Sequence, residues 1–188
     1  MTPERHTFSH RGLRLSYLDS DPNDHLRPAV LLLHGFPDHA EMWQAQIQAL
    51  HQAGFRCIAP DTVGCGHSEI APNQSDYHAD DIISDHLALL KHLKIKQSHV
   101  VGHDWGAIVV WNLAMLHPER VCGVINLSVP FMNRGETEWV SNWEKMGGDD
   151  FYIVHFNRQP GVADAAFAEN PRRFLGNLYR TDHWLDPQ

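Results

Sequence analysis

A five-residue segment, Gly102–Gly106 with the sequence GHDWG, constrains the fold of this chain more than any other feature. The apolar pair Val100-Val101 before it favours a short strand, and the apolar run Trp105–Leu116 has the length of a helix. Glycine two positions before and two after Asp104 permits a turn so sharp that larger side chains would collide with the neighbouring elements. The segment therefore predicts a strand, a tight turn and a helix. Asp104 should lie above the carboxyl end of a sheet, beside a helix N-terminus whose dipole favours a carboxylate.

Strand-like and helix-like segments alternate before Pro130. The opening residues His6–Ser20 alternate around a turn at Arg11-Gly12 and predict a β-hairpin. Further strands are predicted at Ala29–Leu33, Phe55–Pro60, Val100-Val101 and Val121–Leu127, and helices at Ala40–Ala53, Tyr77–Leu93 and Trp105–Leu116. This alternation predicts an α/β fold with a mostly parallel central sheet and helices on both faces. The helix Trp105–Leu116 is apolar nearly all round, so we expect it to be buried.

The character of the sequence changes after Pro130. Aromatic and charged residues mix, helical stretches are predicted around 136–145, 163–168 and 171–179, and no further buried strand is predicted. We therefore expect two domains: residues 1–130 as the sheet-containing core, and residues 131–188 as the start of a helical cap over the mouth of the sheet.

Composition excludes several kinds of partner and location. Acidic residues outnumber basic residues by 23 to 15 without any basic run, which argues against nucleic acid. No apolar run approaches the roughly 20 residues needed to cross a bilayer, and the polar N-terminus is not a signal peptide. The three cysteines, Cys57, Cys65 and Cys122, form no CxxC pair and are expected to be reduced thiols. These features predict a cytoplasmic protein that does not bind a membrane.

Metal binding is considered because the chain has 15 histidines. None of them belongs to an HExxH or CxxC…HxxxH pattern. Asp81, Asp85 and His86 fall on neighbouring helical positions, but we interpret them as a solvated helix face. No metal and no cofactor is predicted.

The residue at the centre of the GHDWG segment determines which reaction the segment predicts. Serine is the commonest residue at the centre of such a nucleophile elbow and attacks a carbonyl carbon. Aspartate is already charged at neutral pH and can displace a leaving group at a saturated carbon, which gives an ester with the enzyme. Water must then hydrolyse that ester. The alternative is that Asp104 only caps a helix, as aspartates commonly do.

A second motif favours the catalytic interpretation. His34-Gly35-Phe36-Pro37 follows the predicted strand Ala29–Leu33, where a loop can aim the Phe36 backbone N–H at the reacting centre. The backbone N–H of Trp105, next to Asp104, supplies another donor. Together these two amides would form an oxyanion hole for the hydrolysis of the ester.

With these residues, the sequence resembles the epoxide hydrolases of the α/β-hydrolase superfamily, from about His10 to Trp184. The segments that carry the resemblance are HGFPD at 34–38, DTVGCGHS at 61–68, GHDWG at 102–106, SVPF at 128–131 and FYIVHF at 151–156. The resemblance implies a cis peptide bond before Pro37. It also implies that Tyr152 is the first of two cap tyrosines that hydrogen-bond the epoxide oxygen, although one extra residue stands between Phe156 and Pro160.

The function implied is hydrolysis of an epoxide to a vicinal diol, with water as co-substrate and no cofactor. Asp104 attacks, Tyr152 assists the opening oxygen, and the Phe36 and Trp105 amides hold the later oxyanion. An apolar pocket for a small apolar epoxide would be lined by Phe36, Pro37, Trp105, Ile108 and Phe156. Two alternatives stay open: a haloalkane dehalogenase with the same nucleophile, although Phe36 has no polar side chain for a halide, and a non-catalytic binding module.

The resemblance also implies residues that this chain does not contain. In the family, a histidine that activates water and its acid partner follow the cap, as does the second tyrosine. We therefore expect the 188 residues to be an incomplete portion of a protein of roughly 300 residues, able at most to form the ester on Asp104. We also expect the strand Val121–Leu127 to expose an apolar edge, which favours aggregation or association, for example as a homodimer.

Overall fold

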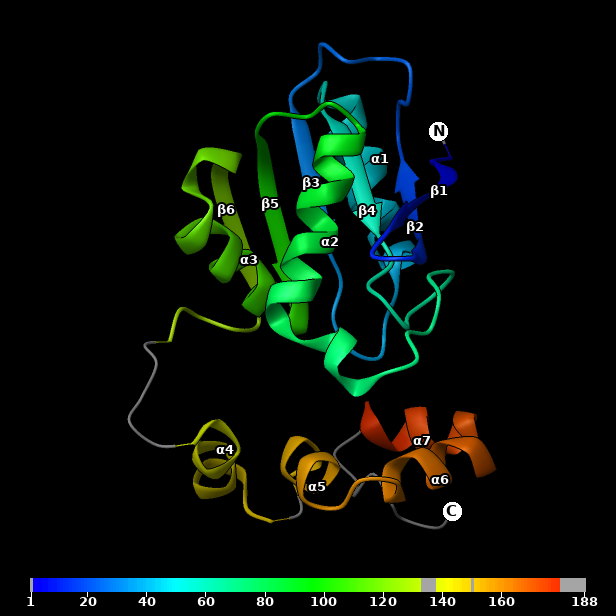
Figure 1. Ribbon diagram of the computed structural model, residues 1–188, viewed down its shortest axis with the longest axis vertical. Coiled ribbons are helices and arrows are strands. Elements are labelled where there is room, and N and C mark those ends of the chain that lie inside the picture. Colours follow the sequence, from blue (N-terminus) through cyan, green and yellow to red (C-terminus); the bar gives the residue numbers. More distant parts are fainter. Residues whose placement is uncertain (1, 133–137, 150, 180–188) are drawn as a thin grey trace. The chain divides into compact units, whose positions relative to one another are not determined.

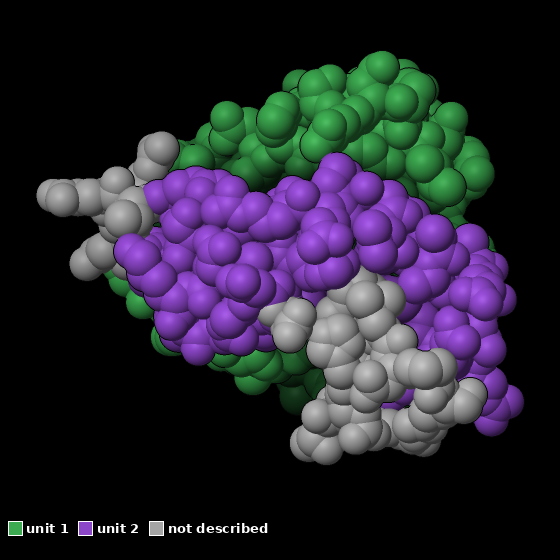
Figure 2. All heavy atoms as spheres, turned by 90° about the horizontal axis from the view of Figure 1, so that it is seen from below, with its two compact units in different colours: residues 1–131 green, residues 132–188 purple. Residues whose placement is uncertain are grey.

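A computed structural model describes residues 2–132, 138–149 and 151–179. The chain divides into two compact units, Met1–Phe131 and Met132–Gln188 (Figure 1, Figure 2). All strands of the described residues belong to the first unit, and the described part of the second unit is helical.

The first unit is built on one six-stranded sheet. Its strands are β1 Glu4–His10, β2 Leu13–Asp19, β3 Ala29–Leu33, β4 Arg56–Pro60, β5 Ser98–His103 and β6 Val121–Leu127. They lie in the order β1-β2-β4-β3-β5-β6. The hairpin β1–β2 joins β4 antiparallel, and the four strands from β4 to β6 run parallel. The predicted fold class, a mostly parallel sheet in an α/β fold, is confirmed.

Helices lie on both faces of this sheet. In Figure 1, α2 (Ala79–His92) and α3 (Trp105–Leu116) stand in front of the strands, and α1 (Gln44–Gln52) lies behind them. Three short 3-10 helices precede or follow them, η1 Ala40–Trp43, η2 Gln74–Tyr77 and η3 Pro118–Arg120. The predicted helix Ala40–Ala53 is therefore a 3-10 turn followed by an α-helix, whereas the predicted helix Tyr77–Leu93 corresponds to α2 and η2 precedes it.

Successive residues of β3 point to opposite faces of the sheet and so contribute to two cores. Leu31 and Leu33 pack in the cluster under α2 and α3, with Ile58 and Val100. Val30 and Leu32 pack in the cluster on the α1 face, with Trp43, Ile47 and Val101. Because both faces are covered, β3 is apolar at every position.

The strand β6 forms one edge of the sheet, so the expected apolar edge is present. Ile125 is 58 % exposed, and Leu127 is exposed as well. Beside these side chains a trough of about 460 Å³ runs over the α1 face of β3, β5 and β6, and Phe55 and His99 also line it.

Two predictions about burial are wrong. The helix α3 is not buried all round, because Trp105, Met115 and Leu116 are exposed. The α2 positions interpreted as a solvated face include Asp85 and His86, and both are buried. Asp85 accepts hydrogen bonds from the Arg11 guanidinium at 3.0 and 2.8 Å, and Arg11 lies in the turn of the β1–β2 hairpin. The pattern within one helix could not reveal a partner 74 residues away.

The described part of the second unit contains four helices, α4 Trp139–Gly147, α5 Tyr152–Arg158, α6 Val162–Glu169 and α7 Pro171–Leu178. The sequence predicted counterparts of α4, α6 and α7 but not α5. Ile153, Val154 and Phe174 are buried, and Phe156 stacks on Phe174 with ring centroids 6.1 Å apart. Residues 133–137, 150 and 180–188, which include the first two residues of the predicted helix 136–145, lie outside the described residues. The function of this unit as a cap stays a prediction.

Within the described ranges, no helix is long and apolar enough to cross a membrane. In the same ranges, no group of three or more His, Cys, Asp and Glu side chains is arranged to hold a metal ion.

Candidate active site

Asp104 lies in a sharp turn between β5 and α3, at the position where α3 begins. Its backbone angles, φ 55° and ψ −120°, are in a region that non-glycine residues rarely adopt. The turn is held by its own carbonyl, which accepts a hydrogen bond from the Ala107 N–H at 2.9 Å. The strained backbone angle and the strand–turn–helix predicted for the GHDWG segment are both present.

The glycines on either side of Asp104 are required by close backbone contacts. A Cβ atom on Gly102 would lie 2.3 Å from the Gly106 carbonyl oxygen, and one on Gly106 would lie 2.2 Å from the Leu33 carbonyl oxygen. Real Cβ atoms do not approach backbone atoms this closely, so any side chain here would force β3, β5 and α3 apart. The spacing of the motif thus has the steric cause that the sequence predicted.

The loop after β3 contacts the Asp104 carboxylate directly. The Phe36 backbone N–H donates a hydrogen bond to Asp104 Oδ1 at 2.9 Å. Gly35 packs against the same side chain so closely that a Cβ there would lie 2.4 Å from Asp104 Cβ. The peptide bond between Phe36 and Pro37 is cis, as the resemblance implied. Two of the predicted site residues, Phe36 and Asp104, are therefore brought together.

Two exposed aromatic residues belong to the segments around Asp104, Phe36 through its backbone N–H and Trp105 as the next residue in the sequence. Phe36 is 40 % exposed and Trp105 is 39 % exposed, whereas Pro37 and Ile108 are partly buried. The Trp105 amide belongs to the first turn of α3, directly after Asp104. Exposed aromatic side chains on these segments suit an apolar substrate better than a charged one.

Asp61, directly after β4, connects three segments around the site. It accepts hydrogen bonds from the Ala40 N–H at 2.8 Å, from the His67 N–H at 3.1 Å and from Arg5 Nη1 at 2.7 Å. Burial acts to raise the pKa of Asp61, but these donors outweigh burial and hold the pKa below its ordinary value. Gly66 has φ +53°, and a Cβ there would lie 2.5 Å from Asp61 Oδ1. The DTVGCGHS segment thus folds around its own aspartate.

His34 connects this loop to the loop that contacts Asp104. Its Nε2 accepts a hydrogen bond from the Thr62 N–H at 3.0 Å, and its Nδ1 lies 2.9 Å from the Gly35 carbonyl oxygen. The ring is 3 % exposed, and this burial is the main cause that lowers the pKa of His34. Asp61 and His34 belong to motifs found in the sequence, but no role at the site was predicted for either of them. Their positions directly after the strands β4 and β3 were the signal that they meet at the carboxyl edge of the sheet.

Tyr152 and Phe156, the remaining predicted site residues, belong to the second unit. Tyr152 is the first residue of α5 and is partly buried. Its ring lies 5.0 Å from the ring of Phe151 and 5.5 Å from that of Phe156. The tyrosine thus forms part of an aromatic cluster.

Comparison with known proteins agrees with this geometry. Residues 28–179 match the family described as the alpha/beta hydrolase fold. Epoxide hydrolase A of Mycobacterium tuberculosis is 35 % identical over 181 residues, which cover 94 % of this chain and 55 % of that protein. Epoxide hydrolase 2 of Siraitia grosvenorii is 43 % identical over 141 residues, covering 74 % and 44 %.

Solved structures give the same result. The crystal structure of epoxide hydrolase A from Mycobacterium thermoresistibile superposes with a TM-score of 0.87 at 37 % identity, covering 95 % of this chain and 56 % of that one. The chain thus spans about half the length of the relatives that it matches. The chain belongs to the α/β-hydrolase fold family, and the resemblance to its epoxide hydrolases is confirmed.

Proposed function

We propose that this chain carries the nucleophilic half of an epoxide hydrolase, which converts an epoxide to a vicinal diol through an ester on Asp104. The observation that carries the proposal is the hydrogen bond from the Phe36 N–H to Asp104 Oδ1 at 2.9 Å, with Asp104 on a strained turn at the start of α3. A carboxylate held in this way has one oxygen on a backbone donor, and the second oxygen is the one that attacks. The relatives named as epoxide hydrolases support this reaction class.

In the first step, the second carboxylate oxygen of Asp104 forms a bond to a ring carbon of the epoxide, and the carbon–oxygen bond of the ring breaks. The electron pair goes to the epoxide oxygen, which takes a proton or a hydrogen bond from the Tyr152 hydroxyl. Aspartate needs no base for this attack, because it is charged at neutral pH. The product is an ester between Asp104 and the substrate.

In the second step, water activated by a base attacks the Asp104 carbonyl carbon. Oδ1 becomes an oxyanion, and the Phe36 and Trp105 amides stabilise its charge. Collapse of this intermediate restores the carboxylate and releases the diol. The Phe36 amide already donates to Oδ1 in the resting carboxylate, so the donor is positioned before the charge develops.

The substrate of this site is a small apolar epoxide. Phe36, Pro37, Trp105 and Ile108 stand on the loop and helix next to Asp104 and would line the pocket with apolar side chains, and Phe156 would add to them. None of these five side chains carries a charge that would bind an ionic group. Haloalkanes fit less well, because Phe36 offers no polar side chain to a departing halide.

The test uses styrene oxide and two measurements on the purified protein: intact mass, which detects the ester, and chromatography, which detects the diol. Wild type should gain the mass of one styrene oxide or release phenylethanediol. Asp104→Asn keeps the shape of the side chain but loses the nucleophilic carboxylate, so it should do neither. Peptide mapping of the labelled wild type should place the added mass on the GHDWG segment.

Three outcomes would contradict the proposal. An equal mass gain in Asp104→Asn would place the reaction on another side chain. Halide release from 1-bromobutane without any reaction of styrene oxide would favour a dehalogenase. Unreacted wild type that nevertheless binds styrene oxide reversibly would favour a binding module.

A further inference from the structure

The peptide group between Gly35 and Phe36 makes hydrogen bonds through both its N–H and its carbonyl, and His34 is the partner of the carbonyl. Its N–H donates to Asp104 Oδ1 at 2.9 Å, and its carbonyl oxygen lies 2.9 Å from His34 Nδ1. We propose that His34 is a positioning residue: its Nδ1–H holds this carbonyl and thereby aims the Phe36 N–H at Asp104. The inference rests on the proposed function, since the Phe36 amide is the donor for both the resting carboxylate and the oxyanion.

The protonation pattern of His34 follows from its two partners. Thr62 offers only an N–H, so His34 Nε2 must accept and carries no proton. A neutral imidazole then has its proton on Nδ1, which donates to the Gly35 carbonyl oxygen. One tautomer therefore satisfies both contacts, and the other tautomer would place two donors or two acceptors opposite each other.

Planarity of the peptide group carries the effect of His34 to the catalytic carboxylate. The carbonyl and the N–H of one peptide point in opposite directions in one plane, so fixing the carbonyl fixes the direction of the N–H. The Asp38 N–H also donates to the Gly35 carbonyl, at 3.0 Å. Two donors on one carbonyl polarise the peptide and strengthen its N–H as a donor. His34 thus acts on both the direction of the Phe36 N–H and its strength as a hydrogen-bond donor.

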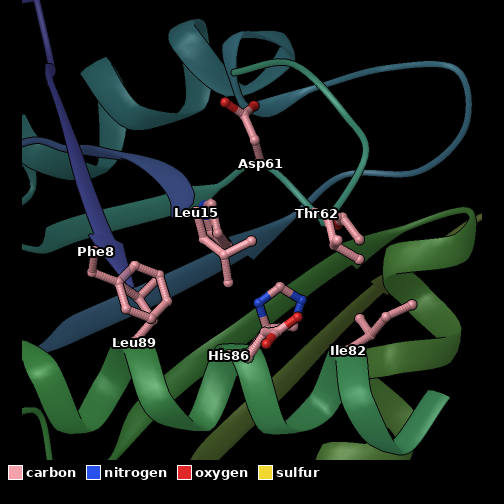
Figure 3. Close-up of a pocket in the computed structure, with 10 residues that line it drawn as sticks. Phe8, Leu15, Asp61, Thr62, Ile82, His86 and Leu89 are labelled. Carbon is pink, nitrogen blue, oxygen red and sulfur yellow. The ribbon is translucent and has the colours of Figure 1, made fainter. Parts of the chain in front are cut away.

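The surroundings of His34 favour the neutral ring. Burial lowers its pKa most, and His39 lowers it further. The hydrogen bond with the Gly35 carbonyl and the charges of Asp61 and Asp38 act in the opposite direction, but the pKa stays below its ordinary value. His86 of α2 faces the same region, and burial lowers the pKa of His86 to about 3. Figure 3 shows the His86 ring pointing from α2 towards the side on which Thr62 lies. The cavity that these residues line measures only about 10 Å³. A proton on His34 Nε2 would face the Thr62 N–H and break the contact between the two loops.

Two substitutions separate the two hydrogen bonds of His34. The amide nitrogen of asparagine in His34→Asn can occupy the place of Nδ1 and keep the donor to the Gly35 carbonyl, but it cannot reach Thr62. The amide oxygen of glutamine in His34→Gln can accept from the Thr62 N–H, but the donor to the Gly35 carbonyl is lost. If aiming the Phe36 amide is the role of His34, Asn should preserve the reaction and Gln should not.

The kinetic readout is the rate at which styrene oxide reacts at Asp104, followed over a range of concentrations. We expect His34→Gln to lower the saturating rate roughly tenfold, because the donor is misaimed rather than removed, with little change in the half-saturating concentration. His34→Asn should stay within about threefold of wild type, as expected for loss of one ordinary hydrogen bond. A purely structural role would slow both variants alike. Equal rates for the two variants, or the reverse order, would overturn the proposal.

A second readout needs no reaction. NMR of ring nitrogens in wild type should detect a His34 proton on Nδ1 at pH 8, and lowering the pH should move the Phe36 amide resonance in step with protonation of the His34 ring. A ring that carries its proton on Nε2, or a Phe36 amide that ignores the titration, would refute the role of His34. If styrene oxide reacts with no variant, the proposed function fails, and the NMR result alone decides the role of His34.

Discussion

The two faces of the sheet differ in how completely helices cover them. On the face under α2 and α3, the core is closed, and the cavity beside His86 measures only about 10 Å³. On the opposite face, α1 packs over β3 and β4, while a trough of about 460 Å³ lies open beside it, over β3, β5 and β6. The Asp104 turn depends on close contacts within the β3–β5–α3 layer, which belongs to the closed side. The geometry of the site is therefore set by the tightly packed side of the sheet and does not depend on what covers the open face.

The largest difference in stability between the closed and the open side of the sheet is expected when one methyl group is added on each of them. Gly106→Ala places a Cβ against the Leu33 and His34 carbonyl oxygens, which are backbone atoms that cannot move away independently. We expect a loss of more than about 4 kcal/mol in the free energy of unfolding, or no folded protein. Gly123→Ala meets only the His99 ring at 3.1 Å, and this ring lines the open trough and can turn aside.

Urea denaturation of the two glycine variants measures this contrast. The Gly123→Ala variant is the matched control and should lose less than about 1 kcal/mol. If both variants are destabilised equally, the trough is not open in solution.

A smaller difference in stability is expected when an isoleucine is shortened to alanine in a covered strand and in the edge strand. Ile58 of β4 is fully buried, so Ile58→Ala should leave a cavity and lower the free energy of unfolding by about 3 kcal/mol. Ile125 of β6 is 58 % exposed, and Ile125→Ala should change the free energy of unfolding by no more than about 0.5 kcal/mol. Thermal unfolding followed by circular dichroism compares the two. A large loss from Ile125→Ala would mean that another chain or segment covers β6.

The smallest contrast concerns pH on the closed face. Burial lowers the pKa of His86 from 6.5 to about 3, so the unfolded chain takes up the proton first as the pH falls. Above pH 6.5, His86 is neutral in both the folded and the unfolded state and does not lower the free energy of unfolding. As the pH falls from 6.5 towards 3, the unfolded chain gains the proton and the free energy of unfolding decreases progressively. Between pH 7.5 and pH 5 the loss from His86 should be about 2 kcal/mol, at about 1.4 kcal/mol per pH unit below 6.5.

His86→Phe keeps a planar ring that cannot be protonated, and it should remove this part of the pH dependence. The measurement is urea denaturation of wild type and variant at pH 7.5 and pH 5. His34 remains in the variant and leaves a residual slope of the same sign, because its pKa is lowered as well. Identical slopes in the two proteins would contradict the burial of His86.

Local patterns in the sequence predicted those features that depend on neighbours along the chain. The strand Val121–Leu127 has the predicted bounds, and the hairpin turns at Arg11 and Gly12, because alternation and turn residues act within a few positions. The helix α5 was not predicted, since the residues FYIVHF are aromatic and β-branched and carry no helical period over seven positions. Instead, Phe156 of this helix stacks on Phe174, a contact that lies outside any local pattern of the segment.

The sequence by itself determined the sharp turn at Asp104, because glycines two positions away leave only one local solution to the steric problem. It also determined the fold class through the alternation of strands and helices. Only the tertiary structure decided which residues complete the site. The Phe36 amide reaches Asp104 across 68 positions of sequence, and Thr62 reaches His34 across 28. Contacts of this kind are made by the order of parallel strands, whose carboxyl ends bring separate loops to one edge of the sheet.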